Sequence, residues 1–173
     1  AEGGGYGTGA APPVPRPDLL CLGKAMAGGF PLSVCLGTKA AMDAWGASRG
    51  ESLHTQTFLG NPLGCAMAVA ALRELRRIDA PRLARERGAA LRAKLERAGC
   101  GAVRGCGLML AVEVRDPLFA MTALLRRGVL ALPVGEGRDF ALALVPPLTI
   151  SDEQMDFVVD ALVASCAERA QSV

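Results

Sequence analysis

Lys24 is the residue of this sequence whose surroundings most favour chemistry. It follows the short apolar run 19–22, which is long enough for a buried strand and too short for a stable helix. Gly23, Gly28 and Gly29 allow a sharp bend around it, so we expect Lys24 on a loop at the end of a strand. Desolvation there would disfavour the ammonium form and leave a nucleophilic amine, which is the chemistry of a Schiff-base lysine. The alternative is an ordinary loop lysine whose charged end stays in water.

The way in which the chain obtains positive charge also draws attention to Lys24. Lysine and arginine together number 19, but the only lysines are Lys24, Lys39 and Lys94. Arginine is effectively always charged in proteins, whereas a lysine amine titrates when it is buried. A lysine at a special position in an arginine-rich chain is therefore of interest for its amine.

The composition predicts a globular protein of one domain or two small ones, since the chain has 173 residues. A chain of this length buries roughly 70% of its unfolded surface. The apolar content of 51% and the mean hydropathy of +0.30 are high, which indicates that part of the surface binds a partner. A net charge of +2 and an aromatic content of 4% argue against nucleic-acid binding.

The cysteines and the single histidine limit the kinds of site that the chain can carry. The six cysteines are scattered and form no CxxC pair, which favours buried, reduced thiols in a cytoplasmic protein over disulfides or zinc ligands. His54 is the only histidine, so we expect no metal site. There is no secretory signal and no apolar run of about 18 residues, so we predict neither export nor a membrane span.

The first residues do not resemble the start of a domain. Residues 1–9 are rich in glycine, residues 10–17 contain four prolines, and there is no initiator methionine. We therefore expect the chain to be a piece of something longer, or a protein whose first half has been lost.

The hydrophobic pattern interleaves strands with helices, which predicts an α/β fold. Asn61 and Pro62 are expected to begin a helix that is buried on most sides in its first half. Asp79 is a possible cap for the next helix, and we place the domain boundary between these two helices. Ser151 and Gln154 have capping-box spacing. The expected strands are 19–22, 33–38, 107–114, 129–132 and 140–145, and the expected helices are 39–45, 62–78, 82–98, 117–127 and 152–170.

Five segments, taken together, resemble the C-terminal half of the class-III pyridoxal-phosphate-dependent aminotransferases. Each segment alone is a weak match, whereas five in the family's order and spacing form a specific one. The segments are PDLLCLGKAMAGGFPL (17–32), HxxTFxGNPL (54–63 and the following glycine), VRGxGLM (103–109), RGVL (127–130) and PPLTIS (146–151). The resemblance covers the chain from about residue 17 to the last helix.

This resemblance implies a fold of two parts. Residues 1–79 would be a partial large domain of a fold-type-I pyridoxal-phosphate enzyme, without the N-terminal half of the family fold. Residues 80–173 would be the small C-terminal α/β domain. The resemblance also implies a homodimer, or pairing with the missing N-terminal half.

The site residues that the resemblance implies are Lys24 and Thr57. Lys24 would hold pyridoxal 5′-phosphate through a Schiff base and, once released, carry a proton between substrate and cofactor. Thr57 would hydrogen-bond the cofactor phosphate, in this family usually from the neighbouring subunit. A small hydroxyl before a helix start suits that role, although by itself Thr57 reads as an ordinary loop threonine. His54 and Asn61 also match, and we interpret them as a hydrogen-bonding loop residue and a helix cap.

The sequence departs from the family pattern at two positions that bind charge. The family's acidic residue beside the pyridinium nitrogen lies just before a glycine-rich stretch, and here that region offers only Glu2. Without an acid there, the ring nitrogen is less easily kept protonated. Many members grip the substrate carboxylate with an arginine where this chain has Ala143, and Arg138 lies nearby at a different phase.

The activity that the resemblance implies is transfer of an amino group between an amine or amino acid and a keto acid or aldehyde. Aminomutases, racemases and decarboxylases share the lysine chemistry. The alternative to an enzyme is a non-catalytic remnant or an interaction module of the same fold. The sequence does not define the amino donor or the acceptor.

Overall fold

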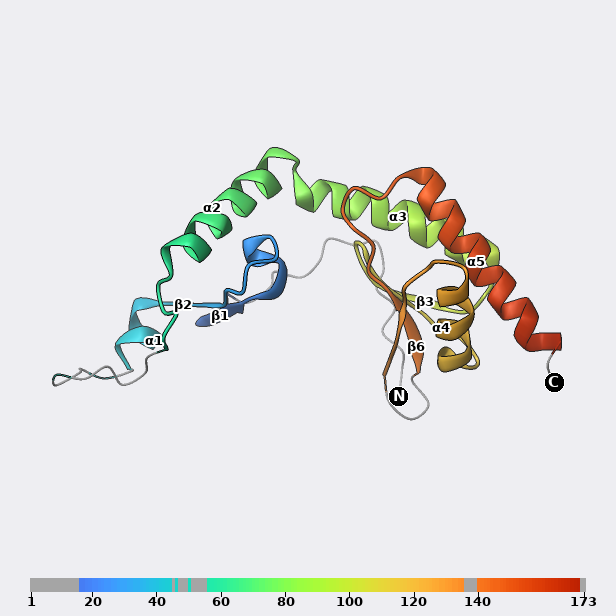
Figure 1. The fold of residues 1–173 in the computed structure, drawn as a ribbon, viewed down its shortest axis with the longest axis horizontal. Coiled ribbons are helices and arrows are strands. Elements are labelled where there is room, and N and C mark those ends of the chain that lie inside the picture. The colour runs from blue at the N-terminus through green and yellow to red at the C-terminus, as the bar shows by residue number, and fades with distance from the viewer. Residues whose placement is uncertain (1–15, 45, 47–49, 51–55, 136–139, 172–173) are drawn as a thin grey trace. The chain divides into compact units, whose positions relative to one another are not determined.

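The computed structural model describes residues 16–44, 46, 50, 56–135 and 140–171 (Figure 1). The chain divides into two compact units, Ala1–Glu74 and Leu75–Val173, which we name unit 1 and unit 2. The domain boundary expected from the sequence, between residues 79 and 80, lies five residues after the boundary between these two units. The expected domain boundary stays a prediction.

Unit 1 contains an antiparallel pair of short strands, β1 (Leu19–Leu22) and β2 (Val34–Gly37). Between them lies η1 (Lys24–Ala27), a single turn of 3₁₀-helix, and after them comes α1 (Lys39–Asp43). Both strands were expected, but the expectation that the first one is buried was wrong. All four residues of β1 are exposed, because in the described part of unit 1 the two strands pair only with each other.

Helix α2 (Pro62–Arg77) begins at the predicted residue. The Gly64 amide donates to Asn61 Oδ1 at 3.1 Å, so Asn61 caps the helix as expected. The expectation that its first half is buried was wrong, because only Gly64 and Ala68 are buried. Leu63, with 59% of its surface exposed, faces water, as do other apolar side chains of the helix. These are Val69, Leu72 and Leu75.

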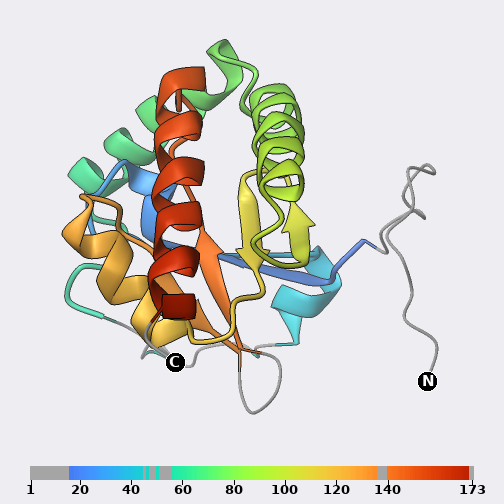
Figure 2. The same cartoon turned by 90° about the vertical axis from the view of Figure 1, so that its right-hand side faces the viewer.

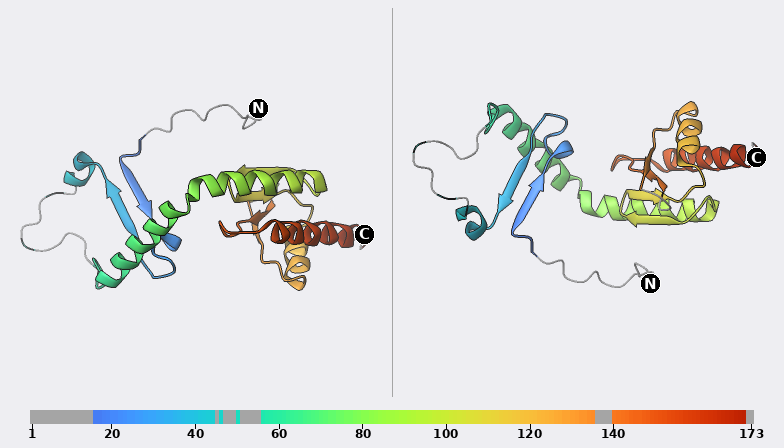
Figure 3. Two further views of the ribbon diagram at one scale, coloured as in Figure 1. Left: turned by 90° about the horizontal axis from the view of Figure 1, so that it is seen from above. Right: turned by 90° about the horizontal axis from the view of Figure 1, so that it is seen from below.

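Unit 2 is a four-stranded antiparallel sheet with three helices, and its strand order is β3-β4-β6-β5. The helices α3 and α5 lie in front of the sheet in Figure 2, and both views of Figure 3 show α3 alongside β3 and β4. The mixed α/β class is therefore confirmed. The elements are α3 (Ala80–Ala98), β3 (Val103–Cys106), β4 (Met109–Val112), α4 (Pro117–Arg126), β5 (Leu132–Val134), β6 (Ala141–Leu144) and α5 (Asp152–Gln171).

The hydrophobic core of unit 2 lies between one face of the sheet and the helices. Leu142 of β6 and Val112 of β4 are almost completely buried. They pack with Leu91 of α3, Leu124 of α4 and Leu162 of α5, which are buried as well. Alternate residues of a strand face opposite sides of a sheet. The less buried Ala143 accordingly lies on the other face.

Glycine 88 allows α3 to approach the sheet closely. A Cβ placed there would lie 2.2 Å from the Gly107 carbonyl oxygen, in the turn between β3 and β4. Arg92, one turn further along α3, donates from its guanidinium to the carbonyl oxygens of Val103 and Gly105 at 2.7 and 2.8 Å. At the opposite edge of the sheet, the middle residue of β5 is Pro133.

Two local predictions about helix ends have opposite outcomes. The capping box at the start of α5 is confirmed, because the Gln154 amide donates to Ser151 Oγ and the Ser151 amide donates to Gln154 Oε1. Capping by the Asp79 side chain is absent, although Asp79 occupies the N-cap position of α3 as expected. Asp79 has left-handed backbone with φ 49° and its carboxylate accepts from Arg82 Nε at 3.2 Å instead of from a helix amide.

Two predicted strands have different limits in the structure. The strand expected at 129–132 begins only at Leu132, because Gly128 has φ 81° and the Val129 amide donates to the Leu124 carbonyl to close α4. The strand expected at 107–114 is Met109–Val112, because Gly107 with φ 54° forms the turn from β3.

Candidate functional site

Lys24 is placed by the strand before it and the turn after it. Strand β1 ends at Leu22, and Lys24 opens η1 with a backbone φ of 54°. Among the described residues other than glycine, only Lys24 and Asp79 have a positive φ. Such backbone costs about 1–3 kcal/mol in a residue with a Cβ, and it recurs at functional sites.

The side chain of Lys24 is exposed, so the expected desolvation was wrong for this structure. The reason is that β1 and the turn at Lys24 have little of the described chain packed over them. Lys39 pairs with Asp43 at 2.6 Å, and Lys94 pairs with Asp156. Lys24 has no hydrogen bond or ion pair with any residue in the described ranges, so its amine is the uncommitted one of the three.

Lys24 lines an open hollow of about 610 Å³ within unit 1. This volume falls within the range of about 300–1,000 Å³ that is usual for small-molecule sites. The wall comes from two segments, the loop between η1 and β2 and the turn before α2. Its residues are Lys24, Gly29, Phe30, Pro31, Leu32, Ser33, Gln56, Phe58, Leu59 and Gly60.

The two walls of the hollow are joined by a contact at Gly64. A Cβ at Gly64 would lie 3.0 Å from a ring carbon of Phe30 and 3.5 Å from a methyl carbon of Leu32. The absence of a side chain at Gly64 therefore lets the loop pack against the first turn of α2. The turn of the second wall is closed by the Leu59 amide, which donates to the Gln56 carbonyl at 2.9 Å.

Thr57 lies in the turn of this second wall, but it does not line the hollow itself. Its neighbours Gln56 and Phe58 do, and Thr57 is exposed. The structure thus brings the segments of Lys24 and Thr57 together at the hollow, but of these two residues only Lys24 lines it. Asn61 has the structural role that was expected for it. His54 and Glu2 lie outside the described residues.

Sequence reasoning did not single out two polar residues of the wall, Ser33 and Gln56. Both carry side chains that can hydrogen-bond to a ligand. Ser33 directly follows the lysine motif 17–32, and Gln56 occupies a variable position inside the motif 54–63, next to Thr57. Reading one residue beyond the first motif would have found Ser33, whereas the pattern of the second motif does not specify Gln56.

The cysteines do not follow the expectation of burial. Cys21, Cys35, Cys65 and Cys106 are exposed, and the remaining two are half-buried. All six thiols are free in the structure, and the expectation of reduced cysteines stays a prediction. The described residues contain no group of three or more side chains that could hold a metal ion. They also contain no helix whose length and apolarity would suit a membrane crossing.

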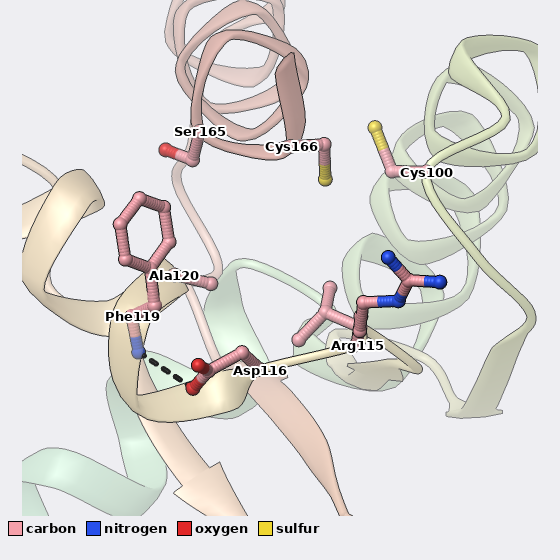
Figure 4. Close-up of a pocket in the computed structure, with 8 residues that line it drawn as sticks. Cys100, Arg115, Asp116, Phe119, Ala120, Ser165 and Cys166 are labelled. Atoms are coloured by element: carbon pink, nitrogen blue, oxygen red, sulfur yellow. Dashed lines mark hydrogen bonds between the residues drawn. The ribbon is translucent and has the colours of Figure 1, made fainter. Parts of the chain in front are cut away.

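A second hollow lies in unit 2, between α5, the start of α4 and the segment after α3 (Figure 4). Cys100 and Cys166 approach each other in this hollow. The pKa of Cys100 is raised to about 11, mainly by burial and to a smaller extent by the charge of Cys166. Asp116 accepts from the Phe119 amide at 3.0 Å and thereby caps α4. Buried Ser165 donates to the Ala161 carbonyl. The polar groups of this hollow thus mainly hold the fold together.

Comparison with known proteins identifies the family. The model of the class-III aminotransferases matches residues 3–165, so the chain belongs to the class-III aminotransferase family. The chain is 39% identical to the acetylornithine aminotransferase of Methanosarcina mazei over 151 residues, which are 85% of this chain and 36% of that protein. It is 34% identical to ornithine aminotransferase 2 of Staphylococcus aureus over 150 residues, with 84% and 36% covered.

Solved structures give the same result. The acetylornithine aminotransferase of Elizabethkingia anophelis matches with a TM-score of 0.75 at 33% identity, covering 88% of this chain and 41% of that one. The ornithine aminotransferase of Toxoplasma gondii matches with 0.76 at 33% identity, covering 91% and 38%. An amine transaminase from an uncultivated Pseudomonas species, in its PLP-bound form, matches with 0.74 at 32% identity, covering 88% and 38%.

The chain therefore spans only about two fifths of the length of the solved relatives and slightly less of the curated ones. The expectation of a partial fold-type-I aminotransferase fold is confirmed by these matches.

Proposed function

We propose that the chain takes part in pyridoxal-phosphate-dependent transfer of an amino group, with Lys24 as the residue that binds the cofactor covalently. The observation that carries this proposal is the state of Lys24. It is the one lysine without a partner in the described ranges, it has φ 54°, and it lines the hollow. Strained backbone beside an uncommitted amine agrees with a functional role for this side chain.

The hollow fits part of the cofactor. Its volume suits a small aromatic phosphate, and the ring of Phe30 with the side chain of Leu32 supplies apolar wall. Ser33 and Gln56 offer polar groups. Among the described residues that line it, none is a carboxylate or an arginine, so this part of the wall offers no counter-charge for a ring nitrogen or a substrate carboxylate.

Pyridoxal phosphate, when bound, supplies an aldehyde that condenses with amines and a ring that withdraws electrons from the substrate carbon. Lys24 Nζ would provide the amine that holds the cofactor in place. When it is not bonded to the cofactor, the same Nζ would take a proton from the amine-bearing carbon of the substrate and return it elsewhere. Phe30 and Leu32 would limit the access of water from their side of the hollow.

We propose that Thr57 anchors the cofactor phosphate. Thr57 is exposed and lies four residues before Asn61, the cap of α2, and the amides of a helix start favour an anion. Because Thr57 does not line the Lys24 hollow of its own chain, its hydroxyl is available to the hollow of a second copy. We accordingly propose a homodimer, or pairing with the remaining part of the fold. The exposed apolar face of α2 supports association.

Reduction with borohydride tests the role of Lys24. The chain is mixed with pyridoxal phosphate, reduced and digested with trypsin. Modification of Lys24 blocks cleavage there, so the label is expected on one peptide that spans Lys24 and ends at Lys39. Lys39 and Lys94 are controls in the same sample, because pyridoxal phosphate also labels ordinary surface lysines. Equal labelling of all three lysines would refute the assignment.

The variants separate binding from chemistry. Lys24→Arg keeps the positive charge and should lose the covalent absorption band, whereas Lys94→Arg should keep it. Thr57→Ala should weaken cofactor affinity by about tenfold while leaving the covalent bond possible, and Thr57→Ser should restore the affinity. If Thr57→Ala binds the cofactor as tightly as the native chain, the phosphate role is wrong.

The substrate class follows from the relatives named above. We propose an amine or amino acid as donor and a keto acid or aldehyde as acceptor, and ornithine and acetylornithine are the first donors to test. Many family members bind the substrate carboxylate with an arginine at the position of Ala143, and this chain has no arginine there. The scattered cysteines, which form no CxxC pair, support a reducing compartment, and we propose the cytoplasm. Light scattering that shows only monomer would count against the proposed association.

A further inference from the structure

Two cysteines face each other across the strands on either side of Lys24. Cys21 of β1 lies directly opposite Cys35 of β2 in the antiparallel register, and their Sγ atoms are 3.8 Å apart. Directly opposite residues of an antiparallel pair place their side chains on the same face of the sheet. Both thiols are exposed, so small reagents can reach them.

The geometry suits a disulfide without movement of the strands. Opposite residues in antiparallel strands have Cα atoms about 4.5–5.5 Å apart, and disulfides span Cα separations of about 4.4–6.8 Å. A rotation of the two thiols about their side-chain bonds is therefore enough to bring the sulfur atoms into bonding distance.

We propose that Cys21 and Cys35 form a redox site that is reversibly oxidised to a disulfide by low-molecular-weight disulfides such as oxidised glutathione. One cysteine, as the thiolate, attacks a sulfur of the external disulfide, forms a mixed disulfide and releases one small thiol. The second cysteine then attacks the protein sulfur of that mixed disulfide and releases the second small thiol. The protein loses two electrons and two protons, and the external disulfide takes up both.

The order of the two attacks follows from the environment of Cys35. The hydrogen bond with Cys21 raises the pKa of Cys35 above its ordinary value, followed by smaller contributions from burial and from the charge of Cys21. Cys35 is therefore the poorer first nucleophile, and Cys21 is expected to attack the external disulfide.

The bridge would enclose the segment that carries the candidate site. Residues 22–34 include Lys24, η1 and one complete wall of the hollow. The oxidised state would hold both ends of this segment covalently. The proposal itself requires no cofactor, and it holds whether or not Lys24 binds one.

The sequence provides a direct assay for the bridge. The chain is equilibrated with mixtures of oxidised and reduced glutathione, free thiols are blocked with iodoacetamide, and the chain is digested with trypsin without reduction. Cleavage after Lys24 separates Cys21 from Cys35, whose peptide is 25–39. A bridge therefore appears as two tryptic peptides joined together, which separate after treatment with dithiothreitol.

The expected result is about tenfold more joined peptide than mixed disulfide at Cys21, because the second thiol is already in place and acts intramolecularly. Cys65 and Cys106 are the matched controls. They are also exposed, and neither forms a hydrogen bond to another thiol among the described residues, so both should carry glutathione. In Cys35→Ser, Cys21 should carry glutathione too, whereas Cys106→Ser should keep the bridge.

Three results would overturn the proposal. The first is the same extent of glutathione addition at Cys21 and Cys35 as at the two control cysteines, with no joined peptide. The second is joined peptide found only in covalent dimers on a non-reducing gel. The third is a bridge from Cys21 or Cys35 to any other cysteine. The native chain alone decides between these results and the proposed one, so the test does not depend on a variant that folds.

Discussion

Replacing Gly88 with alanine tests how closely α3 packs on the sheet of unit 2. In an ordinary helix interior this change stabilises by about 1 kcal/mol, because glycine loses more backbone freedom on folding. Here the new Cβ would lie 2.2 Å from the Gly107 oxygen and 2.3 Å from its carbonyl carbon. Normal contacts are about 3.5–4.0 Å, so the helix and the turn must separate by about 1 Å or more.

The separation affects the core as well as the contact. Leu91 and Leu95 of α3 are almost completely buried against the rest of unit 2, and they move with the helix. Overpacking of this kind costs about 1–3 kcal/mol, which exceeds the gain in helix propensity. We therefore expect Gly88→Ala to lower the free energy of unfolding by roughly 2 kcal/mol and the melting temperature of unit 2 by roughly 10 °C.

Far-ultraviolet circular dichroism is the suitable assay, because three long helices belong to unit 2. Ala89→Gly is the matched control, since Ala89 is exposed on the same helix and should lose about 1 kcal/mol by propensity alone. If Gly88→Ala raises the melting temperature, the close contact with Gly107 is not present in solution.

Three further predictions concern single groups of unit 2. Cys100 should be alkylated by iodoacetamide at a rate that keeps rising to about pH 11, because burial raises its pKa to about 11 and only the thiolate reacts. Ser151→Ala should lower the free energy of unfolding, measured in urea, by about 1 kcal/mol, because the Gln154 amide loses its cap. Glu168→Gln should reduce the loss of stability in acid. The hydrogen bond from Arg127 lowers the pKa of Glu168 below 4.5, so the stabilisation is present above pH 4.5 and is lost as the pH falls through the lowered pKa.

Each of these predictions has its own control. Exposed Cys106 is the reference for alkylation, and a Cys100 that reacts equally fast at neutral pH would contradict the burial argument. Ser151→Thr keeps a hydroxyl and should retain most of the stability; a loss as large as that of the alanine variant would show that the cap is not the cause. For Glu168→Gln, thermal melts between pH 3 and pH 7 decide, and curves parallel to those of the native chain would refute the linkage.

The sequence was most informative where structure depends on neighbouring residues. The start of α2 at Asn61 and the capping box at Ser151 are local hydrogen-bond patterns, so their residues could be predicted directly. The structure that follows α4 could not be predicted in this way. The apolar run 129–132 has the composition of a strand, but the hydrogen bond from the Val129 amide to the Leu124 carbonyl keeps its first residue at the end of α4. The same holds for Asp79, whose carboxylate is engaged by Arg82.

Burial was the property that the sequence predicted least well. An apolar run such as 19–22 shows that a surface is suited to burial, but not whether another element of the described chain covers it. For the candidate site, the motif identified Lys24 and Thr57. The position of Thr57 outside the lining of the hollow and the contribution of Ser33 depend on how two separate segments fold toward each other.

The sheet of unit 2 is protected against growth by strand addition at both edges. At β3, the Arg92 guanidinium occupies the outward carbonyl oxygens of Val103 and Gly105. At β5, Pro133 has no amide hydrogen to offer a further strand. The pair β1–β2 has no comparable device among its described residues. Intermolecular β-sheet formation, and with it aggregation during expression, is therefore expected to start at Leu19–Leu22 and its partner strand, so solubilising substitutions belong in unit 1.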